Sequence, residues 1–412
     1  MREMKDSCVS WIGTVPSDWI RKKVKNAVSL IGSGTTPASS CLQYYESEDV
    51  NWIQSGDIYG IDTIIKTNTM ISNAAVRSLS ALHVYNPDFI VVAMYGGSVG
   101  NIAISKIEAC VNQACCCIRT DNQNDLKFMY YWIYMCKSDF LRVSEGGGQP
   151  NISQAKIRNQ YYMQPPLAEQ RRIADFLDTK CAEIDALTAD IQTQIDTLEQ
   201  YKRSVITEAV TKGLNPDAEM KDSGIEWIGE IPATWNIIRG KYLLKYLQKP
   251  VKEDDGVITC FRDGEVTLRS NRREDGFTMS DKEIGYQGID AGDLVVHGMD
   301  GFAGAIGISD SRGKASPVLN VMDTKQNKRY IMYYLRSMAY SDVFVALATG
   351  IRVRSCDLRW NKLADLPYPV PSIEEQTAIV EYIDTTLEKT DVVISKKKAQ
   401  LETLDEYKKS LI

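Results

Sequence analysis

A long internal repeat constrains this chain more than any other feature. The pattern D-S-x-x-x-W-I-G-x-x-P-x-x-W occurs at residues 6–19 and returns complete at residues 222–235. A second pattern, P-x-x-x-E-Q, occurs at residues 165–170 and again at 371–376. Self-similarity of this kind indicates a duplicated architecture. We therefore expect two related halves, and we interpret the repeated tryptophans as structural anchors that pack in a core.

The two patterns divide the chain into four segments. We predict a globular block A at residues 1–164, a helix A at 165–214, a block B at 215–370 and a helix B at 371–412. Both blocks alternate short apolar runs, such as residues 89–94, with clusters of Gly, Asn, Asp and Ser. That alternation predicts short strands and turns, so each block is expected to be a mixed α/β (α+β) domain.

The segments that follow the blocks read as long helices. Neither Pro nor Gly occurs between Pro166 and Gly213, and apolar residues recur every seven positions. Each helix exceeds thirty residues, or about 50 Å at about 1.5 Å per residue. Neither helix can bury such a stripe alone, so we predict an antiparallel coiled coil of helix A with helix B. The alternative is two separate helices, each packed on its own block.

The heptad pattern also predicts which side chains form the interface between the helices or with another subunit. Lys180 and Gln194 interrupt the pattern of helix A, and Thr390 and Lys397 interrupt that of helix B. The predicted interface residues are Leu177, Ile184, Leu187, Ile191, Leu198 and Tyr201 of helix A, and Ile383, Leu387, Ile394, Leu401 and Leu404 of helix B.

Composition excludes several classes of protein. No run of eighteen apolar residues occurs, and the first residues lack an apolar signal region, so neither a membrane span nor secretion is expected. The ten cysteines include no Cys-x-x-Cys spacing and the chain has only two histidines, so no metal site is expected. Residues 115–117 are all cysteine and are expected to be reduced thiols in a buried strand, which favours a cytoplasmic protein.

The charge of −6 is unevenly distributed. Helices A and B each contain six Lys and Arg against nine Asp and Glu, whereas the two blocks are nearly neutral. The helices are therefore expected to contact protein, and any contact with phosphate is expected from the blocks.

An enzymatic function finds little support in the residues. Asn86-Pro87-Asp88-Phe89 is similar to the Asn-Pro-Pro-aromatic motif of adenine methyltransferases, but Asp88 replaces the second proline and no glycine-rich cofactor turn precedes it. We interpret this segment as a turn before the strand at 89–94. No His–carboxylate–nucleophile set can be assembled around His83 or His297.

The ground plan resembles the specificity subunit of type I restriction–modification systems. The repeated tryptophan pattern, the P-x-x-x-E-Q helix start and the L-x-x-Y-K-x-S-x-I helix end at 198–206 and 404–412 carry the resemblance. Further matches are Gly32-Ser33-Gly34-Thr35-Thr36-Pro37, Trp52-Ile53, Gly56-Asp57-Ile58 and Asn112-Gln113-Ala114. Helix B stops at the counterpart of Ile206, two turns before its twin, so it is expected to be a shortened copy.

The resemblance implies two target-recognition domains that each read one half of a bipartite site in double-stranded DNA. It also implies that the paired helices set the spacing and bind two modification (methyltransferase) subunits, which restriction (motor-nuclease) subunits then join. No cofactor is expected on this chain, because S-adenosylmethionine, ATP and Mg would be bound by the partners. The alternatives are a free-standing sequence-specific regulator with the same fold, and a methyltransferase fusion.

Candidate DNA-binding residues follow from the chemistry of base edges and phosphates. Arg suits guanine, Asn and Gln suit adenine, and Ser and Thr suit phosphate. In block A the candidates are Ser33, Thr35, Thr36, Gln54, Tyr95, Ser98, Gln113, Gln149 and Asn151. In block B they are Arg262, Arg269, Asn271, Arg272, Arg273, Arg352 and Arg354.

Overall fold

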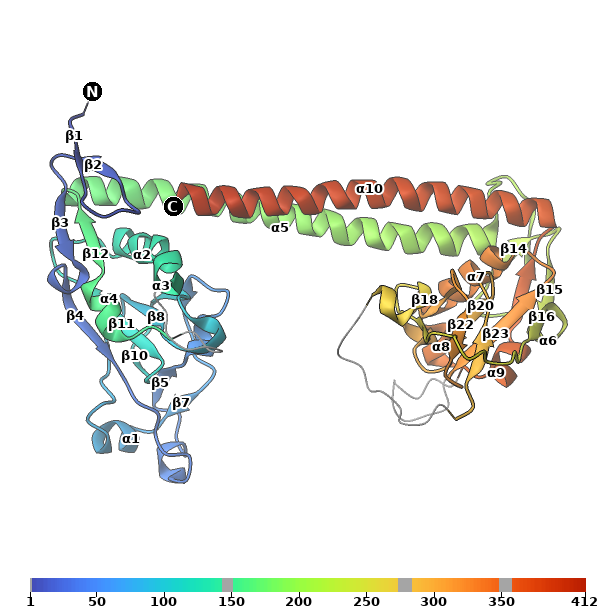
Figure 1. Cartoon of the computed structure of the whole chain (residues 1–412), viewed down its shortest axis with the longest axis horizontal. Helices are drawn as coiled ribbons and strands as arrows, with labels where there is room; N and C mark the ends of the chain where they lie inside the picture. The colour runs from blue at the N-terminus through green and yellow to red at the C-terminus, as the bar shows by residue number, and fades with distance from the viewer. Residues whose placement is uncertain (1, 143–150, 273–283, 348–357) are drawn as a thin grey trace. The chain divides into compact units, whose positions relative to one another are not determined.

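The computed structural model (Figure 1) divides into two compact units. Unit 1 comprises Met1–Ala189 and Leu401–Ile412, and unit 2 comprises Asp190–Gln400. Each unit holds one globular block and a part of each of two long helices, α5 (Leu167–Lys212) and α10 (Ile373–Leu411). The structure describes residues 2–142, 151–272, 284–347 and 358–412.

Block A is built around a five-stranded sheet in the order β4-β11-β8-β9-β6. Strand β11 runs antiparallel to both of its neighbours, and β6 joins the edge parallel to β9. A second sheet, β10-β5-β7, lies beside the first. The strands are β4 (Val28–Ser33), β5 (Val50–Ile53), β6 (Thr63–Ile64), β7 (Met70–Ile71), β8 (Phe89–Ala93), β9 (Ile102–Ser105), β10 (Ala109–Val111) and β11 (Cys115–Thr120).

Both faces of the five-stranded sheet are covered, which explains the unbroken apolar run in β8. Ile90 and Val92 pack toward helix α2 (Leu126–Met135), whereas Val91 and Ala93 pack toward the smaller sheet. The run of three cysteines lies buried in β11, as predicted, and burial raises the pKa of Cys116 to about 12.

Shorter elements frame block A. Strands β1 (Met4–Asp6) and β2 (Thr14–Pro16) form a hairpin, and β3 (Ile20–Lys23) pairs with β12 (Tyr161–Gln164), the last strand before α5. The remaining elements are η1 (Val24–Asn26), η2 (Leu42–Tyr44), η3 (Ser55–Ile58), η4 (Gly96–Ser98), α1 (Asn73–Ser78), α3 (Lys137–Arg142) and α4 (Gln154–Asn159).

Block B repeats this plan with fewer strands. Its central sheet has the order β16-β23-β20-β21, and two-stranded ribbons β17-β18 and β19-β22 cover one face. Hairpin β13-β14 and pair β15-β24 correspond to β1-β2 and β3-β12. The strands are β13 (Met220–Asp222), β14 (Glu230–Pro232), β15 (Asn236–Arg239), β16 (Leu244–Tyr246), β17 (Ile258–Cys260), β18 (Val266–Leu268), β19 (Gln287–Ile289), β20 (Leu294–His297), β21 (Ile306–Ile308), β22 (Gly313–Ala315), β23 (Leu319–Thr324) and β24 (Pro367–Val370).

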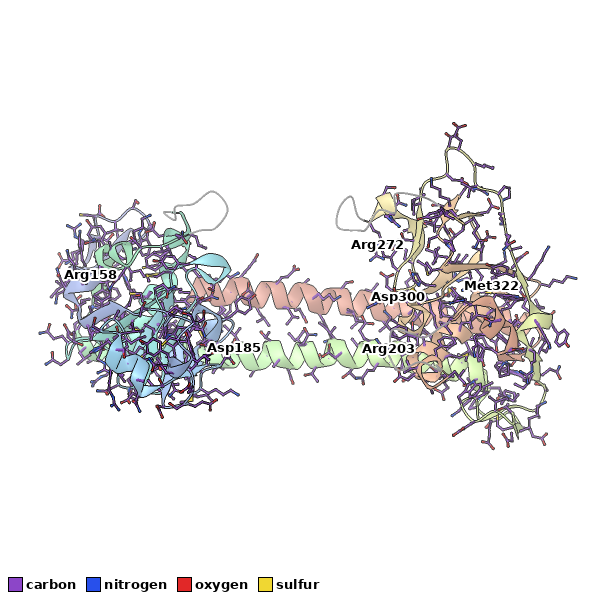
Figure 2. All side chains as sticks on the ribbon, turned by 90° about the horizontal axis from the view of Figure 1, so that it is seen from below. Arg158, Asp185, Arg203, Arg272, Asp300 and Met322 are labelled. Atoms are coloured by element: carbon purple, nitrogen blue, oxygen red, sulfur yellow. The ribbon has the colours of Figure 1, made fainter. Side chains whose placement is uncertain are left out.

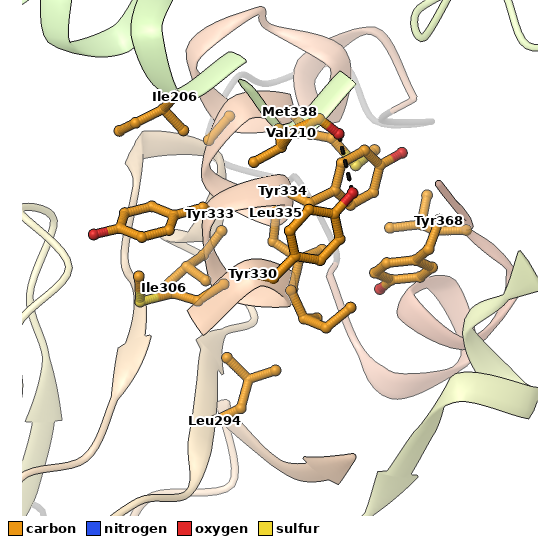
Figure 3. Packing of buried hydrophobic residues seen from close by; sticks show 14 of the residues in the cluster. Ile206, Val210, Leu294, Ile306, Tyr330, Tyr333, Tyr334, Leu335, Met338 and Tyr368 are labelled. Atoms are coloured by element: carbon orange, nitrogen blue, oxygen red, sulfur yellow. Dashed lines mark hydrogen bonds between the residues drawn. The ribbon is translucent and has the colours of Figure 1, made fainter. Parts of the chain in front are cut away.

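Helix α7 (Lys328–Tyr340) covers the other face of this sheet and forms the main core of unit 2 (Figure 3). The hydroxyl of the buried Tyr330 donates to the carbonyls of Val210, at 3.2 Å, and Pro369, at 2.9 Å. The core thus joins the last turns of α5 to α7 and β24. The remaining elements are α6 (Gly240–Leu243), α8 (Val343–Ala346), α9 (Trp360–Asp365), η5 (Arg269–Asn271) and η6 (Gly301–Ala303).

The duplicated architecture and the mixed α/β class are therefore confirmed. The tryptophan anchors are confirmed only in part. Trp235 is fully buried and Trp19 is partly buried, but Trp11 and Trp227 remain 36% and 38% exposed. The first tryptophan of each repeat therefore lies at the surface, so its assignment to the core is wrong.

The two long helices pair antiparallel within each unit, so the predicted coiled coil is confirmed. In unit 2, Lys202 of α5 donates to Asp391 of α10 at 2.6 Å. In unit 1, Lys408 of α10 donates to Asp185 of α5 at 2.7 Å. These two contacts are repeat equivalents, with the roles of the helices exchanged. The alternative of helices packed only on their own blocks is wrong, although both helices also contribute to the block cores.

Burial identifies the seam residues. The predicted seam has two columns, each made of every seventh residue of α5. One column is buried as predicted, and Ile184 and Ile191 are among its buried members. The other column is one residue later than expected, because Cys181 and Ile195 are buried whereas Leu187 and Tyr201 are 48% and 49% exposed. Placing Leu187 and Tyr201 in the helix–helix seam is therefore wrong. The remaining predicted residues are buried or partly buried: Leu177, Leu198, Ile383, Leu387, Ile394, Leu401 and Leu404.

Candidate functional site

Three neighbouring strand ends bring most of the block A candidates together. Strand β4 ends at Ser33, whose backbone pairs with β11, and the hydroxyl of Ser33 donates to the carbonyl of Gln113 at 3.4 Å. The hydroxyl of Thr36 donates to the side-chain oxygen of Gln113 at 2.6 Å. The carbonyl of Thr35 accepts from the indole N–H of Trp52 at 3.3 Å. These contacts hold the polar side chains together at one edge of the sheet, whereas the sequence predicted each residue separately.

The glycine-rich turn after β8 continues this edge. The backbone of Tyr95 bridges to that of Asn151, and the hydroxyl of Ser98 donates to the carbonyl of Tyr95 at 3.3 Å. Tyr95 is 40% exposed and Asn151 is exposed as well, so both can meet a partner. Gln54 belongs to a different contact, because its amide donates to Thr69 at 3.2 Å. Gln149 lies outside the described residues.

The arginines of block B gather on the β17-β18 ribbon, where acidic side chains hold two of them. Arg262 donates to Asp300 at 2.9 Å. Arg272 pairs with Asp263 at 2.7 Å and lies over the ring of Phe261, 4.3 Å from its centroid. These contacts hold the guanidinium groups of Arg262 and Arg272 in position; Arg272 and Asp300 are labelled in Figure 2.

The other block B candidates divide into two groups. Arg269 donates to Thr259 at 3.2 Å, and Asn271 donates to Thr267 at 2.8 Å. Both side chains thus lie along the same ribbon. Arg273, Arg352 and Arg354 lie outside the described residues.

The turn after β20 occupies the place of the turn after β8, and the same backbone bonds hold both. The N–H of Met94 donates to the carbonyl of Ala114 at 2.7 Å, and that of Gly298 donates to Val318 at 2.7 Å. Both turns close on glycines with positive φ, Gly100 and Gly304. The exposed residue of the block B turn, Met299 (54% exposed), was missed from the sequence. The glycine-rich spacing was the signal that marked its position.

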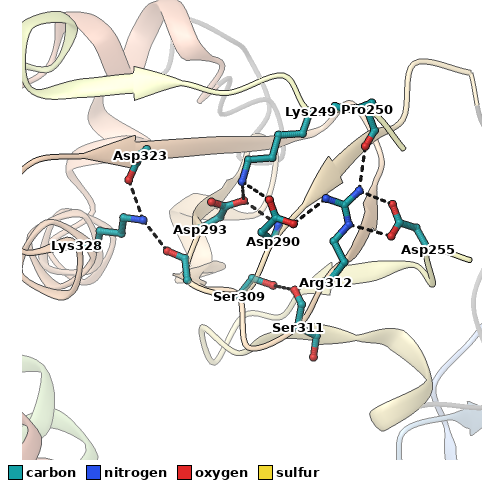
Figure 4. Close-up of polar contacts among 11 residues, drawn as sticks. Lys249, Pro250, Asp255, Asp290, Asp293, Ser309, Ser311, Arg312, Asp323 and Lys328 are labelled. Atoms are coloured by element: carbon teal, nitrogen blue, oxygen red, sulfur yellow. Dashed lines mark hydrogen bonds and ion pairs between the residues drawn. The ribbon is translucent and has the colours of Figure 1, made fainter. Parts of the chain in front are cut away.

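A network of ion pairs stabilises block B around the start of β20 (Figure 4). Arg312 donates to Asp255 at 2.7 Å and to Asp290 at 2.7 Å, and Lys249 bridges Asp290 and the buried Asp293. The Arg312 guanidinium lowers the pKa of Asp255 to about 2. Since each of these carboxylates has a cationic partner, the network serves the fold rather than acid–base chemistry.

Each long helix is tied to its block by the glutamine of the P-x-x-x-E-Q pattern. The side-chain oxygen of the buried Gln170 accepts from the backbone N–H of Asp125, the cap of α2, at 2.9 Å. Gln376 repeats this contact with Asn327, the cap of α7, at 3.0 Å. The two glutamines therefore fix where each helix leaves its block.

Exposed apolar side chains on the helices also follow the repeat. In unit 1, Phe176 and Leu187 of α5 lie on one helical face, and Tyr407 of α10 is close enough to interact with Lys180 on that face. In unit 2, Tyr382 and Tyr201 line one groove. We call these sets the apolar triads. They are Phe176, Leu187 and Tyr407 in unit 1, and their equivalents Tyr382, Val393 and Tyr201 in unit 2, all between 42% and 52% exposed.

The segment that is similar to a methyltransferase motif forms a turn. Asp88 has a positive φ of 66°, and its carboxylate pairs with Lys106 at 2.7 Å, directly before β8. Within the described residues, no group of three His, Cys, Asp or Glu side chains could hold a metal ion. None of the helices in this part of the chain combines the length and apolar character that crossing a lipid bilayer requires.

Comparisons with known proteins agree with this architecture. Residues 16–197 match the family model of the type I restriction modification DNA specificity domain. The chain is 23% identical to the type I restriction enzyme MjaVIII specificity subunit of Methanocaldococcus jannaschii, over 97% of this chain and 92% of that protein. It is 26% identical to the StySPI specificity subunit of Salmonella potsdam over 52% of this chain and 47% of the relative.

Solved structures share the fold. A chain from a structure of complex assembly and conformational transition in the type I R-M system superposes with a TM-score of 0.70 at 13% identity, over 96% of this chain and 97% of that chain. The HsdS subunit from Thermoanaerobacter tengcongensis superposes with a TM-score of 0.53 at 12% identity, over 96% of both chains. The resemblance to type I specificity subunits is thereby confirmed.

Proposed function

We propose that this chain is the DNA-specificity subunit of a type I restriction–modification complex and reads a bipartite target. The observation that carries the proposal is the duplicated block: the same backbone frame presents different side chains in blocks A and B. Two unlike surfaces on one frame suit two unlike half-sites in double-stranded DNA. The chain itself performs no chemistry in this proposal.

The remaining parts of the complex follow from the same proposal. Two modification subunits and the restriction subunits bind the chain, and S-adenosylmethionine, ATP and Mg are bound by those partners. The complex acts in the cytoplasm. The alternative, a free-standing regulator, is not favoured. It would bind its DNA site as tightly alone as with the modification subunits, so the affinity of the purified chain for DNA distinguishes the two.

Mapping of methylated adenines in DNA from cells that carry the complex tests the function. We expect two short sequences separated by a spacer of fixed length. Replacing Arg269 and Arg272 by Ala should weaken recognition of one half by about 1–3 kcal/mol for each true base contact, and leave the other half intact. A continuous target, or equal damage to both halves, would contradict the proposal.

The paired helices are proposed to set the spacer. An insertion of seven residues in both helices, at facing positions, keeps the heptad pattern and should lengthen the spacer that is methylated. The same insertion in α5 alone should break the pairing with α10 and abolish assembly. Matched insertions that leave the spacer unchanged would contradict this role.

The apolar triads are the proposed docking surfaces for the two modification subunits. Their duplication suits two copies of one partner, and the acidic balance of both helical segments suits a partner face with basic residues around an apolar centre. Leu187→Glu and Val393→Glu should each remove one modification subunit, and together they should remove both, as measured by native mass spectrometry. Gln200→Glu, another exposed position of α5, is the matched control. Full assembly of the double variant would contradict the assignment.

A further inference from the structure

The turn after β20 contains a histidine that holds backbone rather than substrate. The ring Nδ1 of His297 accepts from the backbone N–H of Met299 at 3.2 Å and of Asp300 at 3.0 Å. A histidine nitrogen accepts hydrogen bonds only when it carries no proton, so this arrangement requires the neutral ring. The imidazole therefore holds the backbone of the turn in its conformation through these two hydrogen bonds.

Contacts with the backbone of other segments also hold the turn rigid. The carbonyl of Gly298 accepts from the N–H of Leu358 at 2.9 Å. A Cβ on Gly298 would come within 2.9 Å of the carbonyl oxygen of Val318, so only glycine fits there without a shift. The end of the turn, Gly304, has a φ of 95°. The path of the chain between His297 and Gly304 is thus fixed at both ends.

This rigid turn presents one apolar and one charged side chain, and an arginine from the loop between β17 and β18 lies beside them. Met299 is 54% exposed, and the carboxylate of Asp300 holds Arg262, whose side chain is 63% exposed. Arg262 can donate to guanine, Asp300 can accept from the cytosine amine, and Met299 can contact the thymine methyl group. Groups fixed before binding lose little conformational freedom on binding. Block A offers Tyr95 at the equivalent turn, with different chemistry.

We infer that Met299, Asp300 and Arg262 form a further base-reading element of block B, and that His297 is its positioning residue. This inference rests on the proposed function and deepens it, because it identifies the side chains that distinguish the two half-sites. None of Met299, Asp300 and His297 belongs to the arginine cluster that the sequence indicated.

The inference implies a pH dependence confined to one half-site. Burial lowers the pKa of His297. The carboxylate of Asp300 acts to raise this pKa, and the guanidinium of Arg262 acts to lower it further. Two more charged groups, Arg336 and Asp263, act on the neighbouring Cys260. The ring is therefore neutral at neutral pH, and acid that protonates it removes both hydrogen bonds from the turn. Reading of the block B half-site should weaken as the pH falls below the ordinary range of histidine, while reading of the block A half-site should not.

The experiment uses the complex assembled with its modification subunits. The probes are duplexes that carry the bipartite target found by methylation mapping, and duplexes in which one half has been randomised. Met299→Ala and Arg262→Ala should each lower affinity for the intact target by about 5- to 100-fold and have little effect once the block B half is randomised. Tyr95→Ala is the matched variant in block A and should show the reverse pattern.

His297 is tested by two substitutions. His297→Asn keeps an acceptor near the position of Nδ1 and cannot titrate, so it should retain binding and flatten the pH profile. His297→Ala should weaken reading of the block B half-site at every pH, while reading of the block A half-site reports that the protein is folded. If the Asn and Ala variants behave alike, or if Met299→Ala leaves both half-sites unaffected, the inference is wrong. A complex without any bipartite target would instead refute the proposed function.

Discussion

Blocks A and B share a frame but differ in how their repeated tryptophans are covered. In block B, Trp235 is fully buried beneath the end of α5, where a Cβ on Gly213 would lie 3.2 Å from the indole ring. Its indole N–H donates to Glu375 at 3.0 Å. In block A, Trp19 is only partly buried, and the equivalent Glu169 pairs with Arg2. The same motif is thus a core residue in one block and a partly exposed residue in the other.

The hydrogen bonds that hold the helix starts and the turns are nevertheless kept in both blocks, unlike the burial and hydrogen bonding of the tryptophans. The glutamines at the helix starts bind the same helix-cap N–H and the same proline carbonyl in both blocks, whereas their other contacts differ. Divergence at the turns after β8 and β20 follows the same principle, because backbone bonds hold the turn and leave the side chains free to vary. A duplicated frame can therefore support two different surfaces.

The largest difference between the blocks is expected for the tryptophans. Trp235→Ala removes a fully buried ring and should destabilise block B by about 3–5 kcal/mol. Trp19→Ala should cost block A less than about 2 kcal/mol, because part of the ring is already in water. Hydrogen exchange measured by mass spectrometry resolves the two blocks. Equal costs would contradict the argument from burial.

The glutamines should instead behave alike in both blocks. Gln170→Leu and Gln376→Leu each leave the partly buried backbone N–H of a helix cap without its acceptor, which should cost about 1–3 kcal/mol. Chemical denaturation of each variant gives the comparison, with the exposed Gln200→Leu as the control. A marked difference between the two variants would show that the helix starts are not equivalent.

Much of this architecture could be predicted because duplication and heptads are written in the sequence. The seam column of Cys181 and Ile195 could not, because the neighbouring column of Leu187 and Tyr201 is equally apolar, and only tertiary packing decides between them. For the lysines of the seam, the sequence did not decide between a position in the seam and a position in solvent, since a long side chain can cover apolar surface and still reach a carboxylate.

The candidate site was harder to predict than the fold. Clustered arginines indicated the β17-β18 ribbon, but the pairing of Arg262 with Asp300 depends on a contact between segments that are far apart in the sequence. Met299 gave no signal of its own, because its exposure depends on a turn that His297 shapes through backbone contacts. Side-chain chemistry can be read from a sequence more easily than the orientation that gives it a role.

Acid should distinguish the blocks through the Asp255–Arg312 pair, which belongs to block B. The pKa of Asp255 is about 2 in the folded protein, compared with about 3.9 for an unperturbed aspartate. The carboxylate therefore stabilises block B above about pH 4, and this contribution is lost as the pH falls toward 2. Hydrogen exchange at neutral and acidic pH should show block B loosening with acid, and Asp255→Asn should reduce that dependence. An unchanged dependence in the variant would exclude this pair as the cause.

The smallest effects are expected where the two units match most closely, at the seam lysines. Lys202 and Lys408 are repeat equivalents, both with 21% exposed side chains, and each reaches an aspartate on the opposite helix, at 2.6 Å and 2.7 Å. Partly exposed ion pairs contribute about 0.2–1 kcal/mol, and salt screens them. Lys202→Met and Lys408→Met should therefore lower the free energy of unfolding by similar small amounts, or leave it unchanged, because methionine replaces the apolar part of the lysine. Denaturation at low and high salt measures this: the wild-type advantage should shrink with salt in both variants. A loss of several kcal/mol in one variant alone would mean that the lysine in that unit supports a contact that its twin lacks.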